Sequence, residues 1–317
     1  MPARRGPRAA AALALAILAA CSRGDPALGR HVDHPEFSPD IAWTFLIEQT
    51  AAGPRIPGKR PHARTLAWLR EQLALRADTV LLQPFDHDTA PGKKPVRMTN
   101  VLARFRPDEP RRILLAAHWD SRPLADETAD PLERTRMPLP GANDNASGVA
   151  VLLALAEVLR QQPPGIGVDL LFTDGDDFAD GRMLGTESFL TSLLSAQRPA
   201  FAVVLESVGD RDAWFPRDAG SLRHAPAVAH RVWGTAAAIG RDSVFPAETV
   251  DDSAGAHLRF NAAGIPAVQV RDPVYGPGNS YWHTVNDLPS NTSRETLAQV
   301  GAVLAEMIYR GLPEGGR

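Results

Sequence analysis

Short apolar runs alternate with helical patterns along most of this chain. The runs that predict strands are rich in Val, Leu and Phe and are bounded by Gly, Pro or Asp: residues 79–85, 99–105, 112–118, 168–173, 201–206 and 265–270. Helices are predicted where apolar residues recur with the helical period: residues 38–50, 61–76, 145–161, 186–194, 225–239 and 293–312. This alternation predicts an α/β domain of three layers, with a mostly parallel central sheet covered by helices on both faces.

The regular pattern begins at Ser38, a favourable N-cap residue that is followed by Pro39 at the first helical position. No repeat or linker interrupts the pattern after this point. Residues 38–313 are therefore predicted to form a single domain. Residues 21–37 have no periodic apolar pattern and are predicted to be a tether.

The first twenty residues have the composition of an export signal. Three arginines precede an apolar run from Ala9 to Ala20, which is too short for a bilayer core that takes ~20 residues. A plain signal peptide or an uncleaved anchor would also explain the run. However, it ends in "LAAC", which resembles a bacterial lipobox, and Cys21 is the only cysteine of the chain. We expect residues 1–20 to be a lipoprotein signal peptide, with lipidated Cys21 anchoring an exported protein in a bacterial membrane facing the periplasm; Ser22 is compatible with the outer membrane.

Composition narrows the range of partners. The 317 residues are 44% hydrophobic, which is enough for a sizeable core. The net charge is −3 and no basic cluster or stripe is present, so nucleic acid is not an expected partner. With one cysteine, the chain forms no internal disulfide and depends on its core and on any bound metal for stability.

Acidic and imidazole groups follow three of the predicted strands at their carboxyl ends. They are His118, the pair Asp176–Asp177, and Glu206. In open α/β sheets, ligands bind outside the carboxyl ends of the strands. A single polar residue at a strand end is common, but three in one sheet indicate a ligand site.

Three further residues add donors to this set. Asp120 lies two positions after His118 and could orient its imidazole from the same face of an extended segment. Asp144, in "GANDNASG", precedes a helix that Asn143 or Asn145 could cap equally well, which would leave Asp144 free. His283 lies in a Gly/Pro-rich loop, in "YWHTVND".

The acidic stretch "LLFTDGDDFADG" has three possible interpretations. A calcium loop that starts at Asp176 needs an oxygen donor where Phe178 stands and a preceding helix, so calcium is not predicted. Asp174 and Asp180 are interpreted as structural residues of a solvated turn. Adjacent carboxylates cannot both face one point, so Asp177 is predicted to bind a metal and Asp176 to act as a general base. Nitrogen and oxygen donors without a thiolate match a catalytic zinc site.

Five stretches resemble, in order, those of glutaminyl-peptide cyclotransferases and the related co-catalytic zinc aminopeptidases. They are "LLAAHWDSRP", "PGANDNASGVAVLLALA", "DLLFTDGDDF", "VVLESVGD" and "YWHTVNDL", and "RIPG" at Arg55–Gly58 is similar to an early motif of the cyclotransferases. The likeness covers roughly residues 38–312. It implies the fold of the zinc exopeptidases, a catalytic domain, and substrates that are peptide or protein N-termini.

For a cyclotransferase, the resemblance implies one zinc ion held by Asp144, Asp177 and His283. It implies that Asp176 is the general acid/base and that Glu206 supports it. "VDDSAGAH" resembles a motif in which an aspartate assists the base, which would be Asp252 or Asp251. Trp282 would line the pocket for the N-terminal side chain, although ordinary core packing would explain it equally well. The implied reaction converts N-terminal glutamine to pyroglutamate and releases ammonia.

Two other functions stay open. In a di-zinc aminopeptidase, Asp144 would bridge two ions, and His118 and Glu206 would hold the second ion. An inactive scaffold that binds a partner is the third possibility, but such relatives usually lose ligands and every expected position here holds a donor. A serine hydrolase is not predicted, because Ser147 in "NASG" lacks the G-x-S-x-G pattern.

The chain departs from its relatives in two places. The usual Glu-Glu pair is Asp176–Asp177 here, and each side chain is one methylene shorter. A displacement of ~1 Å can cost ~100-fold in rate, so the loop must lie further inward or the activity is weak. The segment "FADGRMLG" is also short and lacks an aromatic residue that some relatives have, which puts closure of the pocket in question.

Overall fold

A computed structural model of the chain describes residues 25–178 and 182–312. The predicted signal peptide, Cys21 and Asp180 lie outside the described residues. The main sheet has the strand order β1-β2-β4-β3-β5-β8. Its strands are β1 (Thr79–His87), β2 (Val96–Phe105), β3 (Arg112–His118), β4 (Gly167–Thr173), β5 (Ala202–Glu206) and β8 (Ala267–Arg271).

The sheet is parallel from β4 through β3 and β5 to β8, and antiparallel at the edge formed by β1 and β2. Every residue of β3 and β4 is buried, which agrees with their continuous apolar runs. In β1, exposed residues are interspersed with half-buried ones, and Pro84 is tolerated there because an edge strand does not need all its N–H donors.

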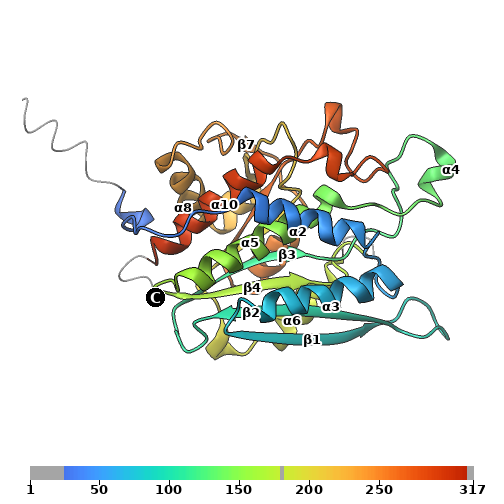
Figure 1. Cartoon of the computed structure of the whole chain (residues 1–317), viewed down its shortest axis with the longest axis horizontal. Helices are drawn as coiled ribbons and strands as arrows, with labels where there is room; N and C mark the ends of the chain where they lie inside the picture. Colours follow the sequence, from blue (N-terminus) through green and yellow to red (C-terminus); the bar gives the residue numbers. More distant parts are fainter. Residues whose placement is uncertain (1–24, 179–181, 313–317) are drawn as a thin grey trace, which may run out of the picture.

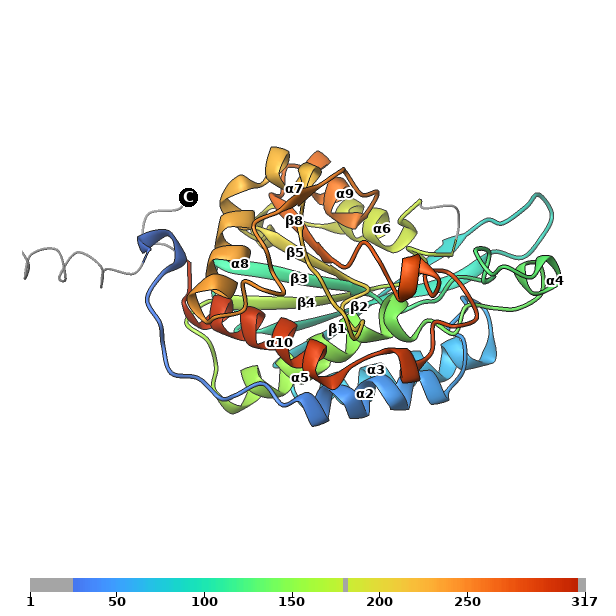
Figure 2. The ribbon, with the colours of Figure 1, turned by 90° about the horizontal axis from the view of Figure 1, so that it is seen from above.

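Helices cover both faces of the sheet (Figures 1 and 2). One face carries the larger core, formed with α2 (Pro39–Ala51), α3 (Arg60–Ala74), α5 (Gly148–Gln161), α8 (Pro226–Ala238) and α10 (Arg294–Tyr309). The other face carries α6 (Leu184–Ser192), α7 (Ala219–His224) and α9 (Ala256–Ala262). The predicted three-layer α/β class is confirmed.

The structure adds elements that the sequence pattern did not predict. They are α7, α9, the four-residue α4 (Pro131–Arg134), and a small sheet of β6 (Arg217–Asp218) with β7 (Thr249–Val250). Residues 142–161 are long and apolar enough to cross a membrane, but 94% of their most apolar window is buried inside the protein. Together with its first turn, α5 is therefore the central helix of the core.

Part of the predicted tether, residues 25–37, packs against the domain. Leu28 is buried, and the Arg310 guanidinium donates a hydrogen bond of 3.1 Å to the Gly29 carbonyl oxygen. Gly29 has a φ of +78°, and a Cβ atom there would lie 2.4 Å from the carbonyl oxygen of Arg310, so a larger residue does not fit. His31 and His34 both hydrogen-bond to Glu306 of α10. The domain boundary at residue 38 stays a prediction.

Candidate metal centre

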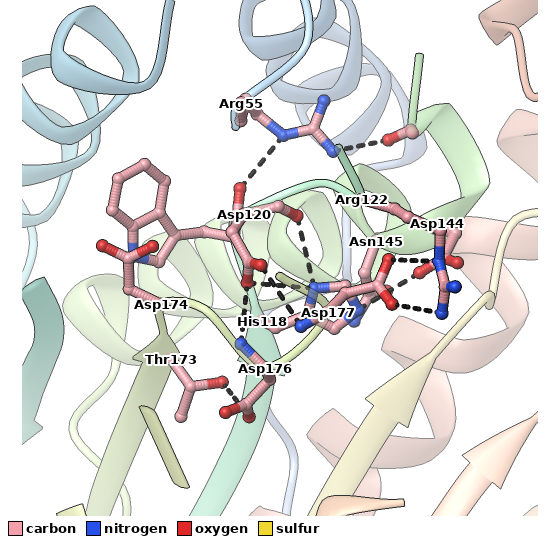
Figure 3. A network of polar contacts seen from close by, with 12 residues as sticks. Arg55, His118, Asp120, Arg122, Asp144, Asn145, Thr173, Asp174, Asp176 and Asp177 are labelled. Carbon is pink, nitrogen blue, oxygen red and sulfur yellow. Dashed lines mark hydrogen bonds and ion pairs between the residues drawn. The ribbon is translucent and has the colours of Figure 1, made fainter. Parts of the chain in front are cut away.

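Five donors from separate segments converge at the carboxyl edge of the parallel strands. Figure 3 shows three of them, His118, Asp144 and Asp177. The five donors form two groups that share Asp144, and within each group the donor atoms lie within 4.8 Å of one another: Asp144, Asp177 and His283 in the first, and His118, Asp144 and Glu206 in the second. The structure thus brings together all the residues predicted as metal ligands, and their roles as ligands stay a prediction.

Asp144 lies between two imidazoles. Its Oδ1 atom is 3.1 Å from Nε2 of His118, and its Oδ2 atom is 3.1 Å from Nε2 of His283. Burial opposes ionisation, but the two histidines outweigh it and hold the pKa of Asp144 well below its usual range. A carboxylate with both oxygens directed at separate nitrogen donors is suited to bridging two cations or to binding one at either side.

The turn that carries Asp144 is held by buried polar contacts. The Asp287 carboxylate accepts hydrogen bonds from the backbone N–H groups of Asn143 (2.6 Å) and Asp144 (3.1 Å). Asn145 accepts a hydrogen bond from the N–H group of Gly148 at the start of α5, at 3.2 Å. Asn145 therefore holds the first turn of α5 as a capping residue would, although the helix itself begins after Ser147 with no side-chain cap, and Asp144 is left to contact the two histidines.

Arg55, from the "RIPG" motif, contacts the same turn and is completely buried. Its guanidinium donates to the carbonyl oxygens of Trp119 (3.0 Å), Pro140 (3.1 Å) and Gly141 (2.6 Å). Gly141 has a φ of +72°, and a Cβ atom there would lie 2.7 Å from the guanidinium. The motif therefore positions the metal-binding turn from a distance in sequence.

Asp120 joins His118 to the acidic loop. Its carboxylate lies 3.4 Å from Nδ1 of His118, as expected for a residue that orients the imidazole. The same carboxylate accepts hydrogen bonds from the backbone N–H groups of Asp176 and Asp177, each at 3.2 Å. Burial opposes protonation of His118, but its hydrogen bonds to Asp120 and Asp144 raise its pKa well above the usual value.

The adjacent carboxylates point to different places. Asp177 belongs to the first donor group, whereas Asp176 lines a small cavity of about 10 Å³ together with His118 and Glu206. Thr186 donates to Asp176 from its N–H (2.9 Å) and hydroxyl (2.6 Å) groups, and the Thr173 hydroxyl donates at 2.7 Å. Burial raises the pKa of Asp176 in spite of these hydrogen bonds. The geometry therefore permits Asp177 to bind a metal and Asp176 to act as the general base, as the sequence predicts.

Arg122 was not identified from the sequence. Its guanidinium forms a two-point ion pair with Asp177, at 2.7 and 3.3 Å, and also contacts Asp126 at 2.7 Å. Burial and the charge of Asp144 raise the pKa of Asp177 to about 7, although Arg122 acts in the opposite direction. The residues around Arg122 in "HWDSRP" did not predict its contact with Asp177, because that contact depends on the path of the loop.

Glu206 completes the second donor group from the end of β5. Burial raises the pKa of Glu206, the positive charge of His118 opposes this shift, and the charge of Asp144 adds to it. The Gln269 side chain donates a weak hydrogen bond to Glu206 at 3.4 Å. No hydrogen bond joins Glu206 to Asp176 among the described residues, so the predicted support of the base would act through charge.

The remaining predicted residues lie around this centre. Trp282 is half-buried and stacks on the imidazole of His283, with ring centroids 3.7 Å apart. Asp252 is exposed, forms an ion pair with Arg223 at 2.9 Å, and has no hydrogen bond to Asp176 among the described residues. The structure therefore places Asp252 outside both donor groups, and its predicted role has no contact that supports it.

The histidine of "VDDSAGAH" also has a different partner. His257 is buried on α9, and its Nε2 atom lies 3.2 Å from Asp218. Asp174, which was expected in a solvated turn, is completely buried. It contacts His62 at 2.9 Å and accepts a hydrogen bond of 2.6 Å from the Thr99 N–H. The solvated-turn interpretation of Asp174 is wrong, because the acidic loop folds inward, and its structural role is confirmed.

The donor set fits zinc. It consists of carboxylate oxygens and imidazole nitrogens without a thiolate, and the first group offers three ligands, the number that catalytic zinc sites take from the protein. The crowded carboxylates contact imidazoles and a guanidinium, which are the positive charges that the chain itself provides. A divalent cation would meet the same electrostatic demand at shorter distances.

Comparison with known proteins agrees with this geometry. The model of peptidase family M28 matches residues 100–308. The structure is similar to that of a glutaminyl cyclase from Tannerella forsythia, with 31% identity and a TM-score of 0.81 over 87% of this chain and 99% of that chain. It is also similar to a leucine aminopeptidase precursor from Bacteroides thetaiotaomicron VPI-5482, with 29% identity and a TM-score of 0.81 over 88% and 99% of the two chains. The Escherichia coli (strain K12) protein YfbL, itself uncharacterized, is 28% identical over 236 residues, which cover 66% of this chain and 70% of YfbL.

Proposed function

The chain belongs to peptidase family M28, and we propose that this zinc-dependent enzyme of peptide N-termini is a glutaminyl-peptide cyclotransferase. Its substrates would be peptides or proteins that begin with glutamine, and its products would be a pyroglutamyl peptide and ammonia. The observation that carries the proposal is the convergence of Asp144, Asp177 and His283 as a three-ligand set. Similarity to the Tannerella forsythia cyclase over 99% of that chain supports the choice of reaction.

A zinc ion held by these three residues would supply Lewis acidity to the γ-carboxamide carbonyl of the substrate. The free α-amine attacks the carbonyl carbon, so that a new C–N bond closes a five-membered lactam. The bond to the amide nitrogen breaks, and ammonia leaves with the proton that the amine gives up. No other reactant is required.

Asp176 is the proposed carrier of that proton. Its carboxyl group is held by Thr173 and Thr186, and it lines a cavity too small for bulk water. Burial raises its pKa, and a carboxyl group with a raised pKa both accepts a proton and returns it at neutral pH. Trp282, stacked on His283, would form one wall of the pocket for the N-terminal side chain.

A di-zinc aminopeptidase is the second candidate, and one observation favours it. His118, Asp144 and Glu206 form a second donor group, whose donor atoms also lie within 4.8 Å of one another. With two ions, Asp144 would bridge them and Asp176 would deprotonate a water molecule for hydrolysis. The similarity to a leucine aminopeptidase precursor supports this alternative.

Metal counting combined with two substrates separates the candidates. Zinc-loaded protein is assayed for ammonia release from a Gln-peptide and for amine release from an aminoacyl amide. Ammonia release that reaches its maximum at one zinc per chain supports cyclisation. Cleavage of the aminoacyl amide that needs two zinc ions, with no ammonia from the Gln-peptide, would establish the aminopeptidase instead. If neither substrate reacts, the chain is a binding scaffold.

The variant Asp176→Asn tests the proton carrier. It should lower the rate ~10²- to 10⁴-fold and leave the zinc content unchanged. Asp86→Asn is the matched control, because Asp86 lies on the edge strand and, among the described residues, forms its ion pair with Arg97 alone. An Asp176→Asn protein with the wild-type rate would exclude Asp176 from the reaction.

We also propose that the protein is exported and held at a bacterial membrane through a lipid on Cys21, on the strength of the lipobox-like "LAAC". In cell fractionation, the wild type should sediment with membranes, and the Cys21→Ser variant should be soluble or keep its signal segment. A wild-type protein found only in the soluble fraction would rule out the anchor.

A further inference from the structure

A larger cavity lies beside the metal centre. Its volume is about 280 Å³, just below the ~300–1,000 Å³ that is usual for small-molecule sites. Residues from the segment after β7 and from the end of β8 line it, with prolines at its margin: Pro216, Asp218, Val250, Asp251, Asp252, Ser253, Gln269, Arg271 and Pro273. This is room for one or two amino-acid side chains.

Two lining residues connect the cavity to the donor groups. Gln269 donates to Glu206 at 3.4 Å and accepts a hydrogen bond of 2.9 Å from the Ser253 hydroxyl. Arg271 is the last residue of β8 and is the register partner of Glu206, the last residue of β5. The Arg271 guanidinium also lies over the indole of Trp282, 5.9 Å from its centroid, and that indole stacks on His283. The cavity therefore continues the carboxyl edge at which a substrate would be held.

Arg271 differs from the other charged residues of the cavity. Asp252 is paired with Arg223 at 2.9 Å, and Asp218 accepts hydrogen bonds from Ser221 and contacts His257. Arg271 is half-buried, yet its guanidinium has no hydrogen bond and no ion pair within residues 25–178 and 182–312. Its donors are positioned by the strand and by the Trp282 contact, but the protein supplies no acceptor for them.

We propose that Arg271 selects substrates that carry a carboxylate, namely N-terminal glutamine peptides with an acidic side chain at the second residue. The inference rests on the proposed action of this site on peptide N-termini. A guanidinium presents parallel N–H donors that match a carboxylate at two points, and such charge-assisted pairs are stronger than neutral hydrogen bonds. Asp252 is paired with Arg223 and Asp251 is exposed at the margin. Arg271 interacts with Glu206 and Asp272 through charge, without a hydrogen bond within residues 25–178 and 182–312, so its N–H donors are the ones the cavity offers to a carboxylate.

The test compares kcat/KM for peptides that differ at one residue. Gln-Ala, Gln-Glu and Gln-Lys peptides examine the second position. The wild type should prefer Gln-Glu over Gln-Ala by ~10-fold or more. In Arg271→Gln the ratio of acidic to neutral peptide should fall to about one, and in Arg271→Lys, which keeps the charge but loses the two-point geometry, it should be intermediate.

The exposed Arg241, which does not line the cavity, provides the control variant Arg241→Gln, and this variant should keep the wild-type ratio. The inference is wrong if the wild type shows no acidic preference, or if Arg271→Gln retains it. An equal loss for all peptides would mean that Arg271 only supports Trp282, which also overturns the inference. If Arg271→Gln does not fold, the ratio in Arg271→Lys decides.

Failure of the proposed function would look different. Zinc-loaded wild type that turns over none of the three Gln-peptides and no aminoacyl amide would contradict the action on N-termini itself. Turnover of neutral peptides with a ratio of one contradicts only the selection by Arg271. The separate values of kcat and KM add a further check, because a contact made equally with substrate and transition state changes KM and leaves kcat unchanged.

Discussion

Two buried charge clusters lie at opposite ends of the same strand, β4. At its amino end, Asp169 meets Arg104 and Arg112. At its carboxyl end, the loop with Asp176 and Asp177 meets the turn with Asp144. Both clusters are enclosed by the same fold, but they differ in how completely the protein satisfies them.

At the amino end every charge has a partner from the chain. Asp169 accepts hydrogen bonds from both arginines, with distances from 2.9 to 3.4 Å. Arg112 also donates to the carbonyl oxygens of Pro107 and Glu109. At the carboxyl end, carboxylates crowd one another, and burial with mutual repulsion raises the pKa of Asp177 to about 7. A closed set of ion pairs fixes structure, whereas an excess of buried negative charge demands an external cation.

The largest expected effect comes from removing the donor that both groups at the carboxyl end share. Asp144→Asn should lower kcat/KM by ~10³-fold or more, because loss of even an indirect metal contact costs 10- to 100-fold. Zinc content of the purified variant, measured with activity, checks the cause. A variant that keeps a full complement of zinc and a tenth of the activity would contradict the assigned ligands.

A substitution in the cluster at the amino end of β4 should lower the free energy of unfolding rather than kcat/KM. Asp169→Asn leaves two buried guanidinium groups without their counter-ion, which should cost about 3–5 kcal/mol in the free energy of unfolding by urea. Zinc content of the folded protein should not change. The exposed pair of Asp86 and Arg97 supplies the control, since Asp86→Asn should cost less than about 1 kcal/mol. Equal costs at the two sites would mean that the amino-end cluster does not hold the structure.

Chelation of zinc should destabilise the protein through the carboxyl end alone. Zinc at about 100 times its dissociation constant adds ~2.7 kcal/mol of stability, which a chelator removes. Thermal unfolding should show this loss in the wild type and in Asp169→Asn, and show none in Asp144→Asn. A chelator effect that persists in Asp144→Asn would place the stabilising ion elsewhere.

The smallest effect concerns a buried carboxyl group near the same edge but outside both donor groups. Burial raises the pKa of Asp272 to about 7, although it accepts hydrogen bonds from the N–H groups of Val274 and Trp214. Its contribution to stability is complete below about pH 3, where the carboxyl group is protonated in folded and unfolded chains alike. It declines as the pH rises toward 7, because only the unfolded chain ionises freely.

Comparing the pH dependence of the free energy of unfolding for the wild type and for Asp272→Asn isolates the contribution of this carboxyl group. Between pH 5 and pH 6.5 the wild type should lose about 2 kcal/mol of stability relative to the variant. The constant difference from a lost hydrogen bond does not affect this slope. Parallel pH profiles for the two proteins would show that Asp272 is ionised in the folded state and that the edge tolerates its charge.

The main elements could be predicted from sequence because they depend on apolar periodicity. Strand β3 has its predicted bounds, Arg112–His118, since its whole run is buried. Helix α5 was predicted to begin three residues early, because the turn around Asp144 is not helical. Helix α9 was missed because seven residues with three buried side chains give too short a pattern. The strand order and the antiparallel edge depend on long-range pairing, which the local pattern does not encode.

For the site, the chemistry of each donor could be predicted but the support around it could not. The types and strand-end positions of His118, Asp177 and Glu206 are visible in the sequence. The contact of Arg122 depends on the path of its loop to Asp177, 55 positions away. The contacts of Asp287 appear only when segments 139 or more positions apart meet, such as those that carry Asp144 and His283. Asp252 pairs with Arg223, and its predicted role stays a prediction without a supporting contact.

The docked stretch before Ser38 has a consequence for how large substrates would approach. It lies against the final turn of α10 and reaches the far end of α5, where Gln162 donates to the Asp33 carbonyl oxygen at 2.8 Å. The catalytic loops begin at the other end of α5, ~20 Å away by the rise of a helix. Only Ser22, Arg23 and Gly24 separate Cys21 from Asp25. A lipid at Cys21 would thus place the opposite end of the domain next to the bilayer, and the candidate metal centre would face away from the membrane. It would be accessible to the N-termini that protrude from folded proteins rather than to chains lying on the membrane.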